Sequence, residues 1–205
     1  MGENSTMITY CVDFDDLCDT VADRSLEYLL KVKEKHPEFS CTLFTIPNRT
    51  SNETIAKFKQ YPWIALAPHG WHHTRGECLT WPYHEAEAKI LEAIQRGIDA
   101  PAFRAPAWLI NRATYEVCRD YNIVVCDHLD QFLKVIDTKV YRYNDPAWCK
   151  AKTRNIHGHL TDCAVDNFIV NMFEDGRLSF AKKAQFIYPW EAAKRILEDG
   201  GEDLE

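Results

Sequence analysis

The chain lacks several features that would assign it to a common class of protein. No apolar run in its 205 residues approaches the roughly 20 residues that a membrane-spanning helix needs. Residues 1–7 lack the basic and then apolar layout of a secretory signal. Its lysines and arginines form no large cluster, and the net charge of -7 is opposite in sign to that of a surface that binds a phosphate backbone. We therefore expect a cytoplasmic protein with no membrane span and no nucleic-acid partner.

Paired cysteines are also lacking. The chain has eight cysteines but no Cys-x-x-Cys pair, which argues against a zinc ribbon. Cys11, Cys41 and Cys126 lie inside apolar, strand-like runs, where a reduced cysteine acts as a small hydrophobic side chain. We expect reduced thiols in the core and no disulfide framework.

The length and the pattern of the sequence favour one α/β domain over residues 1–205, with a core of about 7–198, because two halves would each be marginal. Short β-rich runs alternate with segments of helical period, which is typical of repeated β-α units. The pattern predicts strands over 7–14, 40–46, 63–67, 102–105, 122–126, 140–143, 154–159, 167–170 and 178–180. It predicts helices over 17–36, 51–60, 82–97, 113–121 and 189–198, followed by an acidic tail that frays.

Polar residues that directly follow strands are the candidates for chemistry, because strand ends form the working face of α/β folds. The first group is Asp13-Phe14-Asp15-Asp16. Three carboxylates this close repel one another unless a cation compensates them, which favours a metal ligand beside a general base. An acidic cap on the following helix is the alternative.

The second group is His69-Gly70-Trp71-His72-His73, after the third strand. His69 and His73 with one carboxylate would give a zinc-type site three protein ligands and leave one position open for water. His72 is the spare histidine. Surface histidines beside a tryptophan are the alternative.

Two further groups follow later strands. Arg104 is able to pair with a carboxylate in a bidentate manner, and Pro106 and Trp108 would form a rigid wall. His157 and His159 alternate with Gly158 on a strand, so both imidazoles face the same way and either is suited to act as a general acid. A second metal site or a structural pair is the alternative for these histidines.

Taken together and in this order, the four groups resemble the polysaccharide deacetylase family, which shares the NodB homology domain and is grouped with the family 4 carbohydrate esterases. The His-Gly-aromatic-x-His form is similar to a compact branch of deacetylase-like proteins. The resemblance covers residues 7–160 and implies an irregular, incomplete (β/α) barrel of about seven strands. The chain departs from the family pattern at Leu17, where glycine is usual.

The resemblance also implies roles for the individual residues. Asp15 would be the base, and Asp16, His69 and His73 would hold a divalent metal, for which we expect Zn2+, with Co2+, Mn2+, Ni2+ or Fe2+ as alternatives. Arg104 would orient Asp15. His157 or His159 would be the acid. Asp127, which follows a strand, would tune that histidine.

The activity that follows is metal-dependent hydrolysis of an N-acetyl or related acyl group on an amino sugar or glycan. Trp71, Trp108 and Pro106 would contact the substrate, although tryptophans are equally suited to core packing, as is Trp81. Two alternatives stay open: a metal-dependent amidase for a small C–N compound, and a carbohydrate-binding relative without turnover. The oligomeric state stays open as well.

Overall fold

The computed structural model describes residues 7–127, 140–142, 153–161 and 168–198. One sheet runs in the order β3-β2-β1-β7, and β8 also pairs with β1. A second sheet has the order β4-β5-β6, and all the pairings in both sheets are parallel. The strands are β1 (Ile8–Leu17), β2 (Cys41–Thr45), β3 (Ile64–Pro68), β4 (Ala102–Phe103), β5 (Val124–Asp127), β6 (Val140–Arg142), β7 (Thr153–His159) and β8 (Ala184–Ile187).

A parallel bridge between His69 and Arg104 links the two sheets just beyond β3 and β4. The strands therefore follow one another in the order β7-β1-β2-β3-β4-β5-β6. Within the described residues no pairing joins β6 to β7, so the barrel is open at that point. The predicted α/β class and incomplete parallel barrel are confirmed.

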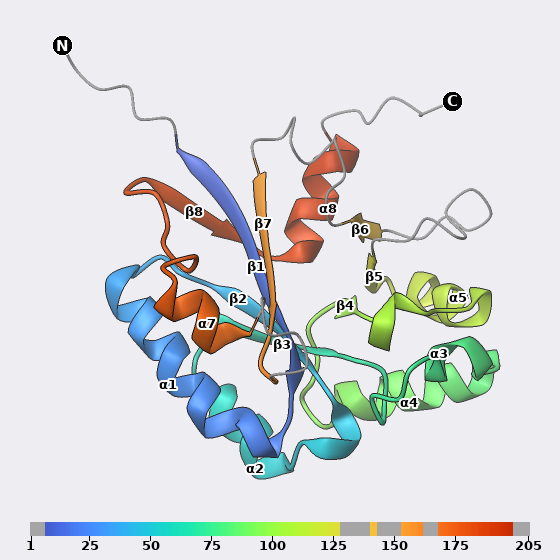
Figure 1. Ribbon diagram of the computed structural model, residues 1–205. Helices are drawn as coiled ribbons and strands as arrows, with labels where there is room; N and C mark the ends of the chain where they lie inside the picture. Colours follow the sequence, from blue (N-terminus) through green and yellow to red (C-terminus); the bar gives the residue numbers. More distant parts are fainter. Residues whose placement is uncertain (1–6, 128–139, 143–152, 162–167, 199–205) are drawn as a thin grey trace.

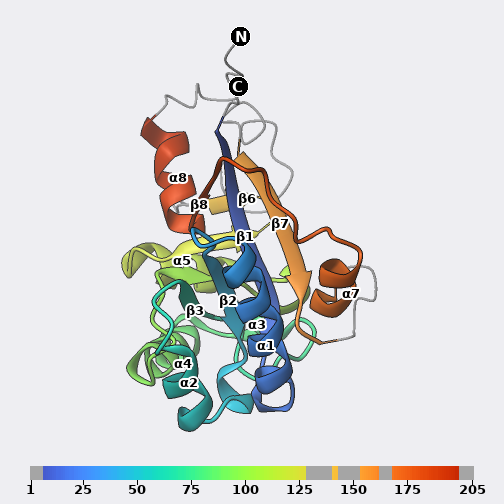
Figure 2. The same cartoon turned by 90° about the vertical axis from the view of Figure 1, so that its left-hand side faces the viewer.

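The helices surround the strands, as Figures 1 and 2 show. On one side lie α1 (Asp19–Lys35), α2 (Asn52–Phe58) and α7 (Ile169–Glu174), and on the other α3 (Glu77–Thr80), α4 (Tyr83–Gln95) and α5 (Arg112–Asp120). The last helix, α8 (Pro189–Glu198), lies at the end where β1 begins, and its Ala192 and Ala193 pack into the apolar cluster between the strands. The opposite end, where β1, β2 and β3 finish, is left to loops that carry the polar groups.

Local signals in the sequence explain where the helices begin and what they bury. Ser51 caps α2 by accepting a hydrogen bond from the backbone N–H of Thr54, and Asn111 caps α5 in the same way. Ala22, Leu26, Leu29 and Val32 lie at helical spacing and form the buried face of α1. The five predicted helices are all present, with ends shifted by a few residues.

Two of the predicted strands are wrong. In place of a strand over 167–170, Ile169, Val170 and Met172 form the buried face of α7, and residue 167 lies outside the described part. Residues 178–180 belong to no strand, and Phe180 packs edge-on against Tyr10 at 4.9 Å between ring centroids. Short apolar runs do not separate strands from buried helices, which explains both errors.

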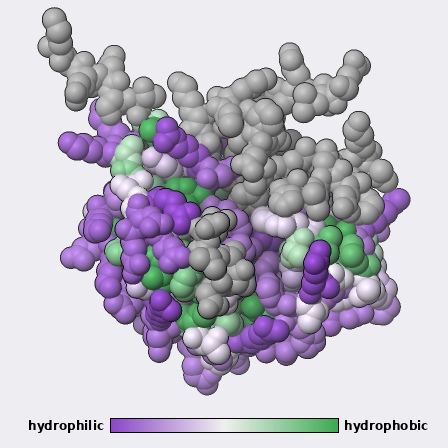
Figure 3. Space-filling model, viewed as in Figure 1, coloured by the Kyte–Doolittle hydropathy of each residue, from purple (hydrophilic) through white to green (hydrophobic). Residues whose placement is uncertain are grey.

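Apolar residues are concentrated inside the molecule. The described cysteines are buried thiols outside any disulfide, as predicted, namely Cys11, Cys18, Cys41, Cys78, Cys118 and Cys126. Cys149 and Cys163 lie outside the described residues. Outside the grey atoms, the face in Figure 3 is largely hydrophilic, with hydrophobic residues in separate patches. Among the described helices, none has the length and apolar character to cross a bilayer.

Candidate active site

A β-bulge at the end of β1 brings the aspartates together. On one edge β1 pairs regularly with β7, so that Asp13 lies opposite His157 and Asp15 opposite His159. On the other edge the register with β2 shifts between Phe14 and Leu17. Asp16 lies within this shift and has a left-handed φ of 74°. Side chains alternate in a regular strand, so the bulge is what lets neighbouring Asp15 and Asp16 both reach the same imidazole.

Asp16, His69 and His73 form a compact set of metal-type donors. Asp16 Oδ1 lies 2.8 Å from His73 Nε2 and 3.6 Å from His69 Nε2, and the three donor atoms all lie within 4.8 Å of one another. Ligands about 2.0–2.2 Å from a tetrahedral zinc ion lie roughly 3.4 Å apart, which falls between the two distances to Asp16. The set therefore fits a divalent metal.

Neighbouring groups orient these donors. The backbone carbonyl of Arg104 is 3.0 Å from His69 Nδ1 and can only accept, so Nδ1 carries the proton and the lone pair of a neutral His69 is on Nε2, toward Asp16. Thr161 donates from Oγ1 to Asp16 Oδ2 at 2.7 Å, which leaves Asp16 Oδ1 facing the two imidazoles. Asp16 Oδ1 and His69 Nε2 therefore point toward the same place, next to His73 Nε2.

Arg104 joins the remaining carboxylates. Its fully buried guanidinium donates from Nη1 to Asp13 Oδ1 at 2.8 Å and to Asp15 Oδ1. Asp13 Oδ1 also accepts from His157 Nδ1 at 2.8 Å. A carboxylate oxygen that accepts from both nitrogens explains why Arg104 Nη1 and His157 Nδ1 lie only 3.2 Å apart. His157 Nε2 is then directed toward Asp15 Oδ2, at 3.9 Å.

The electrostatics of the site favour one divalent cation. Burial raises the pKa of Asp13, but the charge of Arg104 and the hydrogen bond from His157 outweigh it, so this pKa lies below the ordinary value. Burial likewise raises the pKa of Asp16, and its contacts with His69 and His73 bring it well below that value. Three buried carboxyl groups, those of Asp13, Asp15 and Asp16, thus share the site with one buried guanidinium, and a divalent cation would offset this excess of acidic groups.

A second group of donors, Asp15, His157 and His159, also lies within 4.8 Å. Burial lowers the pKa of His159 below its ordinary value, although the charge of Asp15 acts in the opposite direction. The guanidinium of Arg104 already binds Asp15 on this side, and its positive charge opposes a cation here. The arrangement favours proton transfer over a second metal.

No protein-family profile and no curated protein matches the sequence. Solved structures match the fold. An acetyl xylan esterase of family 4 from Clostridium thermocellum, in complex with cobalt, is 14% identical with a TM-score of 0.59 over 91% of both chains. The peptidoglycan deacetylase PdaC from Bacillus subtilis is 17% identical with a TM-score of 0.54 over 94% of both chains.

A family 4 pseudoenzyme from Bacillus anthracis is 10% identical with a TM-score of 0.58, over 89% of this chain and 64% of that one. The chain has the fold of the family 4 carbohydrate esterases. The predicted resemblance to polysaccharide deacetylases is thus confirmed at the level of the fold.

The backbone of this family 4 fold is strained around the site. Among the described residues, five other than glycine have a positive φ, and four of them belong to the groups above: Asp16, His73, Ala107 and Trp108. Such conformations cost of order 1–3 kcal/mol each and persist where the surrounding structure imposes them, typically at functional sites. The acidic-cap alternative for Asp15 and Asp16 is wrong, because α1 has Cys18 at its N-cap and no side-chain cap hydrogen bond.

The predicted site residues of this family 4 fold are only partly brought together. Trp108 lies at the site, with its ring 5.4 Å from that of His157 between centroids and 4.6 Å from the guanidinium carbon of Arg104. Asp127 accepts a hydrogen bond from the hydroxyl of Tyr115 at 2.5 Å. The carboxylate at His157 Nδ1 is that of Asp13.

Other predicted contacts fall outside the central cluster. Pro106 is buried, and Trp81 is only 4% exposed and belongs to the core. His72 is exposed, and its Nδ1 accepts from Asn48 Nδ2 at 2.9 Å, so it does not join the metal set. Trp71 is half-buried and borders a separate cavity.

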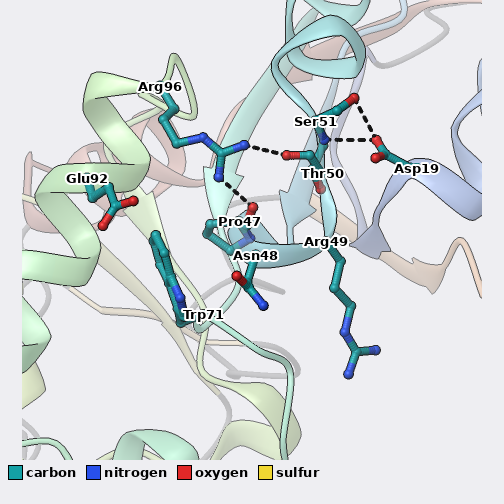
Figure 4. Close-up of a pocket in the computed structure, with 9 residues that line it drawn as sticks. All are labelled: Asp19, Pro47, Asn48, Arg49, Thr50, Ser51, Trp71, Glu92 and Arg96. Carbon is teal, nitrogen blue, oxygen red and sulfur yellow. Dashed lines mark hydrogen bonds between the residues drawn. The ribbon is translucent and has the colours of Figure 1, made fainter.

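That cavity has a volume of about 350 Å³ and is bordered by Trp71, by residues 47–51 and by Glu92 and Arg96 (Figure 4). The guanidinium of Arg96 holds its wall by donating to the backbone carbonyls of Pro47 and Thr50. Its lining is mainly polar, and consists of Asp19, Pro47, Asn48, Arg49, Thr50, Ser51, Trp71, Glu92 and Arg96. An aromatic ring among planar polar groups is a suitable surface for a sugar.

Three residues at the site escaped the sequence reasoning: Asp13 as partner of His157, Thr161 as partner of Asp16, and Glu77, whose carboxylate accepts backbone N–H groups of the loop 69–73. Asp13 carried a readable signal, because residues 13 and 15 alternate onto the same side of a strand. Thr161 and Glu77 depend on loop geometry, and no spacing rule indicates them.

Proposed function

We propose that the chain is a metal-dependent hydrolase that removes an acetyl or related acyl group from the nitrogen of an amino sugar or glycan. The observation that carries this proposal is the position of Asp15. Its Oδ1 is bound by Arg104, while its Oδ2 lies 3.6 Å from His69 Nε2, on the edge of the metal-type set. A carbohydrate-binding protein without turnover has no need of such a base.

The chain's own residues provide the proton path. A divalent cation held by Asp16, His69 and His73 would lower the pKa of a water molecule and polarise the acyl carbonyl. Asp15 Oδ2 would accept a proton from the water that attacks the acyl carbon, because Arg104 fixes the other oxygen and keeps the carboxylate in place. His157 Nε2 then gives a proton to the departing amine, while Asp13 at Nδ1 supports the charged ring.

We assign the metal as zinc, which takes two imidazoles and one carboxylate at three protein positions and keeps a fourth open. Trp108 would border the reacting acyl group, and the cavity beside Trp71 is suited to a neighbouring part of the substrate. The assignment of Trp108 rests on its contact with the ring of His157, and that of Trp71 on its place in the lining of the cavity.

The proposed function is tested by measuring acetate release from N-acetylated sugars, chito-oligomers and an acetylated xylan, and by measuring the amine or ring-opened product formed from small linear and cyclic amides. We expect release from N-acetylated sugars, at rates well above those for the small amides. Hydrolysis confined to small amides would instead establish the alternative amidase. Binding of chito-oligomers without any release would establish a binding relative, comparable to the pseudoenzyme that shares the fold.

The two histidines on β7 are expected to differ in their effect on the pH profile. A general acid must be protonated, so the rate of the wild type should fall as the pH rises through the pKa of the acid. His157→Gln should lower kcat by about 100-fold and remove this alkaline limb. His159→Gln should retain it. Loss of the limb in His159→Gln alone would exchange the two roles.

A further inference from the structure

Glu77 gathers three backbone N–H groups of the loop 69–73. Its Oε1 accepts from Trp71 N at 3.0 Å and from His73 N at 2.9 Å, and its Oε2 accepts from His72 N at 3.0 Å. We infer that Glu77 is a positioning residue that holds this loop in its metal-binding shape. The inference rests on the proposed function, because it assumes that His69 and His73 bind a metal.

The loop needs such a partner because of its conformation. Gly70 and His73 both have a φ of 61°, so the chain turns sharply at each end of the segment 71–72. Three successive N–H groups then point to one side, where strand or helix partners are not available to them. The carboxylate satisfies all three. It therefore fixes the direction in which the His73 side chain leaves the backbone.

Gly70 is matched to Glu77. A Cβ atom built on Gly70 would lie 2.2 Å from Glu77 Oε1 and 2.7 Å from Pro106 Cδ. Only glycine therefore allows both the carboxylate of Glu77 and the ring of Pro106 to pack against this position. This close packing explains why a glycine stands at the second position of the His-Gly-aromatic-x-His motif and what the buried Pro106 packs against.

Both the charge and the acceptor geometry of Glu77 are required to hold the loop 69–73. In Glu77→Gln one oxygen is replaced by an amide nitrogen, which donates. Oε1 would still serve two of the N–H groups, but the third would face a donor. The loop should remain folded around the side chain with its ligands displaced, since groups that orient metal ligands typically affect affinity by about 10- to 100-fold.

The test is a titration of the metal-free protein with Zn2+ and with Co2+, in the wild type, Glu77→Gln and the control Glu53→Gln, an exposed glutamate on α2. We expect Glu77→Gln to raise the Kd for both metals by at least about tenfold and to alter the visible spectrum of bound Co2+ at saturation. Its melting temperature without metal should stay within a few degrees of the wild type, and Glu53→Gln should match the wild type throughout.

Wild-type affinity together with a wild-type Co2+ spectrum in Glu77→Gln would overturn the inference and leave the proposed function intact. A wild type that binds no metal would overturn the proposed function and the inference together. If the wild type binds metal without releasing acetate from any substrate, only the proposed function fails, and the comparison of Glu77→Gln with the wild type still decides the inference.

Discussion

Asp15→Asn is expected to lower kcat for acetate release by about 100- to 10,000-fold while the divalent metal stays bound. The amide cannot take a proton from water, but it has nearly the shape of the carboxylate. The proposed ligands Asp16, His69 and His73 are untouched, and Thr161 still orients Asp16. We would measure kcat and the metal content of the same purified protein.

His69→Ala is the matched comparison for Asp15→Asn. It removes a 98% buried imidazole whose Nε2 faces both Asp15 and Asp16, so the metal as well as the activity should be lost. Equal loss of metal in both variants would contradict the roles assigned here, because it would make Asp15 a ligand. Full activity in Asp15→Asn would remove it from the reaction.

Arg104→Met should destabilise the metal-free protein by about 3–5 kcal/mol, the usual result when one partner of a buried ion pair is removed. The substitution leaves Asp13 and Asp15 buried without their cation. The position also contributes packing, since the guanidinium carbon lies 3.8 Å from the centroid of the Phe44 ring. The free energy of unfolding in urea is the measurement.

The pH dependence of this effect follows from the lowered pKa of Asp13. A carboxyl whose folded pKa is lowered stabilises the protein above its unfolded pKa, and this stabilisation is lost as the pH falls toward the folded value. The difference in the free energy of unfolding between the wild type and Arg104→Met should therefore become smaller as the pH falls below about 4. Arg112→Met, which removes an exposed pair with Glu116, should cost less than about 1 kcal/mol. Similar costs for both variants would contradict the account of Arg104.

The sequence indicated most of the site because the polar groups follow strands of a parallel sheet, whose ends meet. Asp15, Asp16, His69, His73 and Arg104 were predicted by this rule and lie together. It does not show which strands are neighbours, so the pairing of β1 with β7, which brings Asp13 to His157, was not predicted. Asp127 is the last residue of β5, which lies in the other sheet, and it accepts a hydrogen bond from Tyr115.

The fold beyond β7 was predicted less well, because the local sequence did not distinguish a strand from a helix. Residues 168–180 are rich in β-branched and aromatic side chains, and their local preference did not distinguish a strand from the buried face of α7. The bulge at Asp15 and Asp16 is another feature of tertiary structure. Within this bulge Asp16 has a left-handed φ of 74°.

The most direct test of the central claim, that Asp16, His69 and His73 hold one activating metal, is acetate release from a chito-oligomer by metal-free protein as zinc is added back in steps. We predict that the activity rises in proportion to bound zinc, reaches its maximum at one ion per chain, and is absent in His73→Ala. Equal release by the metal-free protein, or full activation of His73→Ala at the same zinc concentration, would contradict the account.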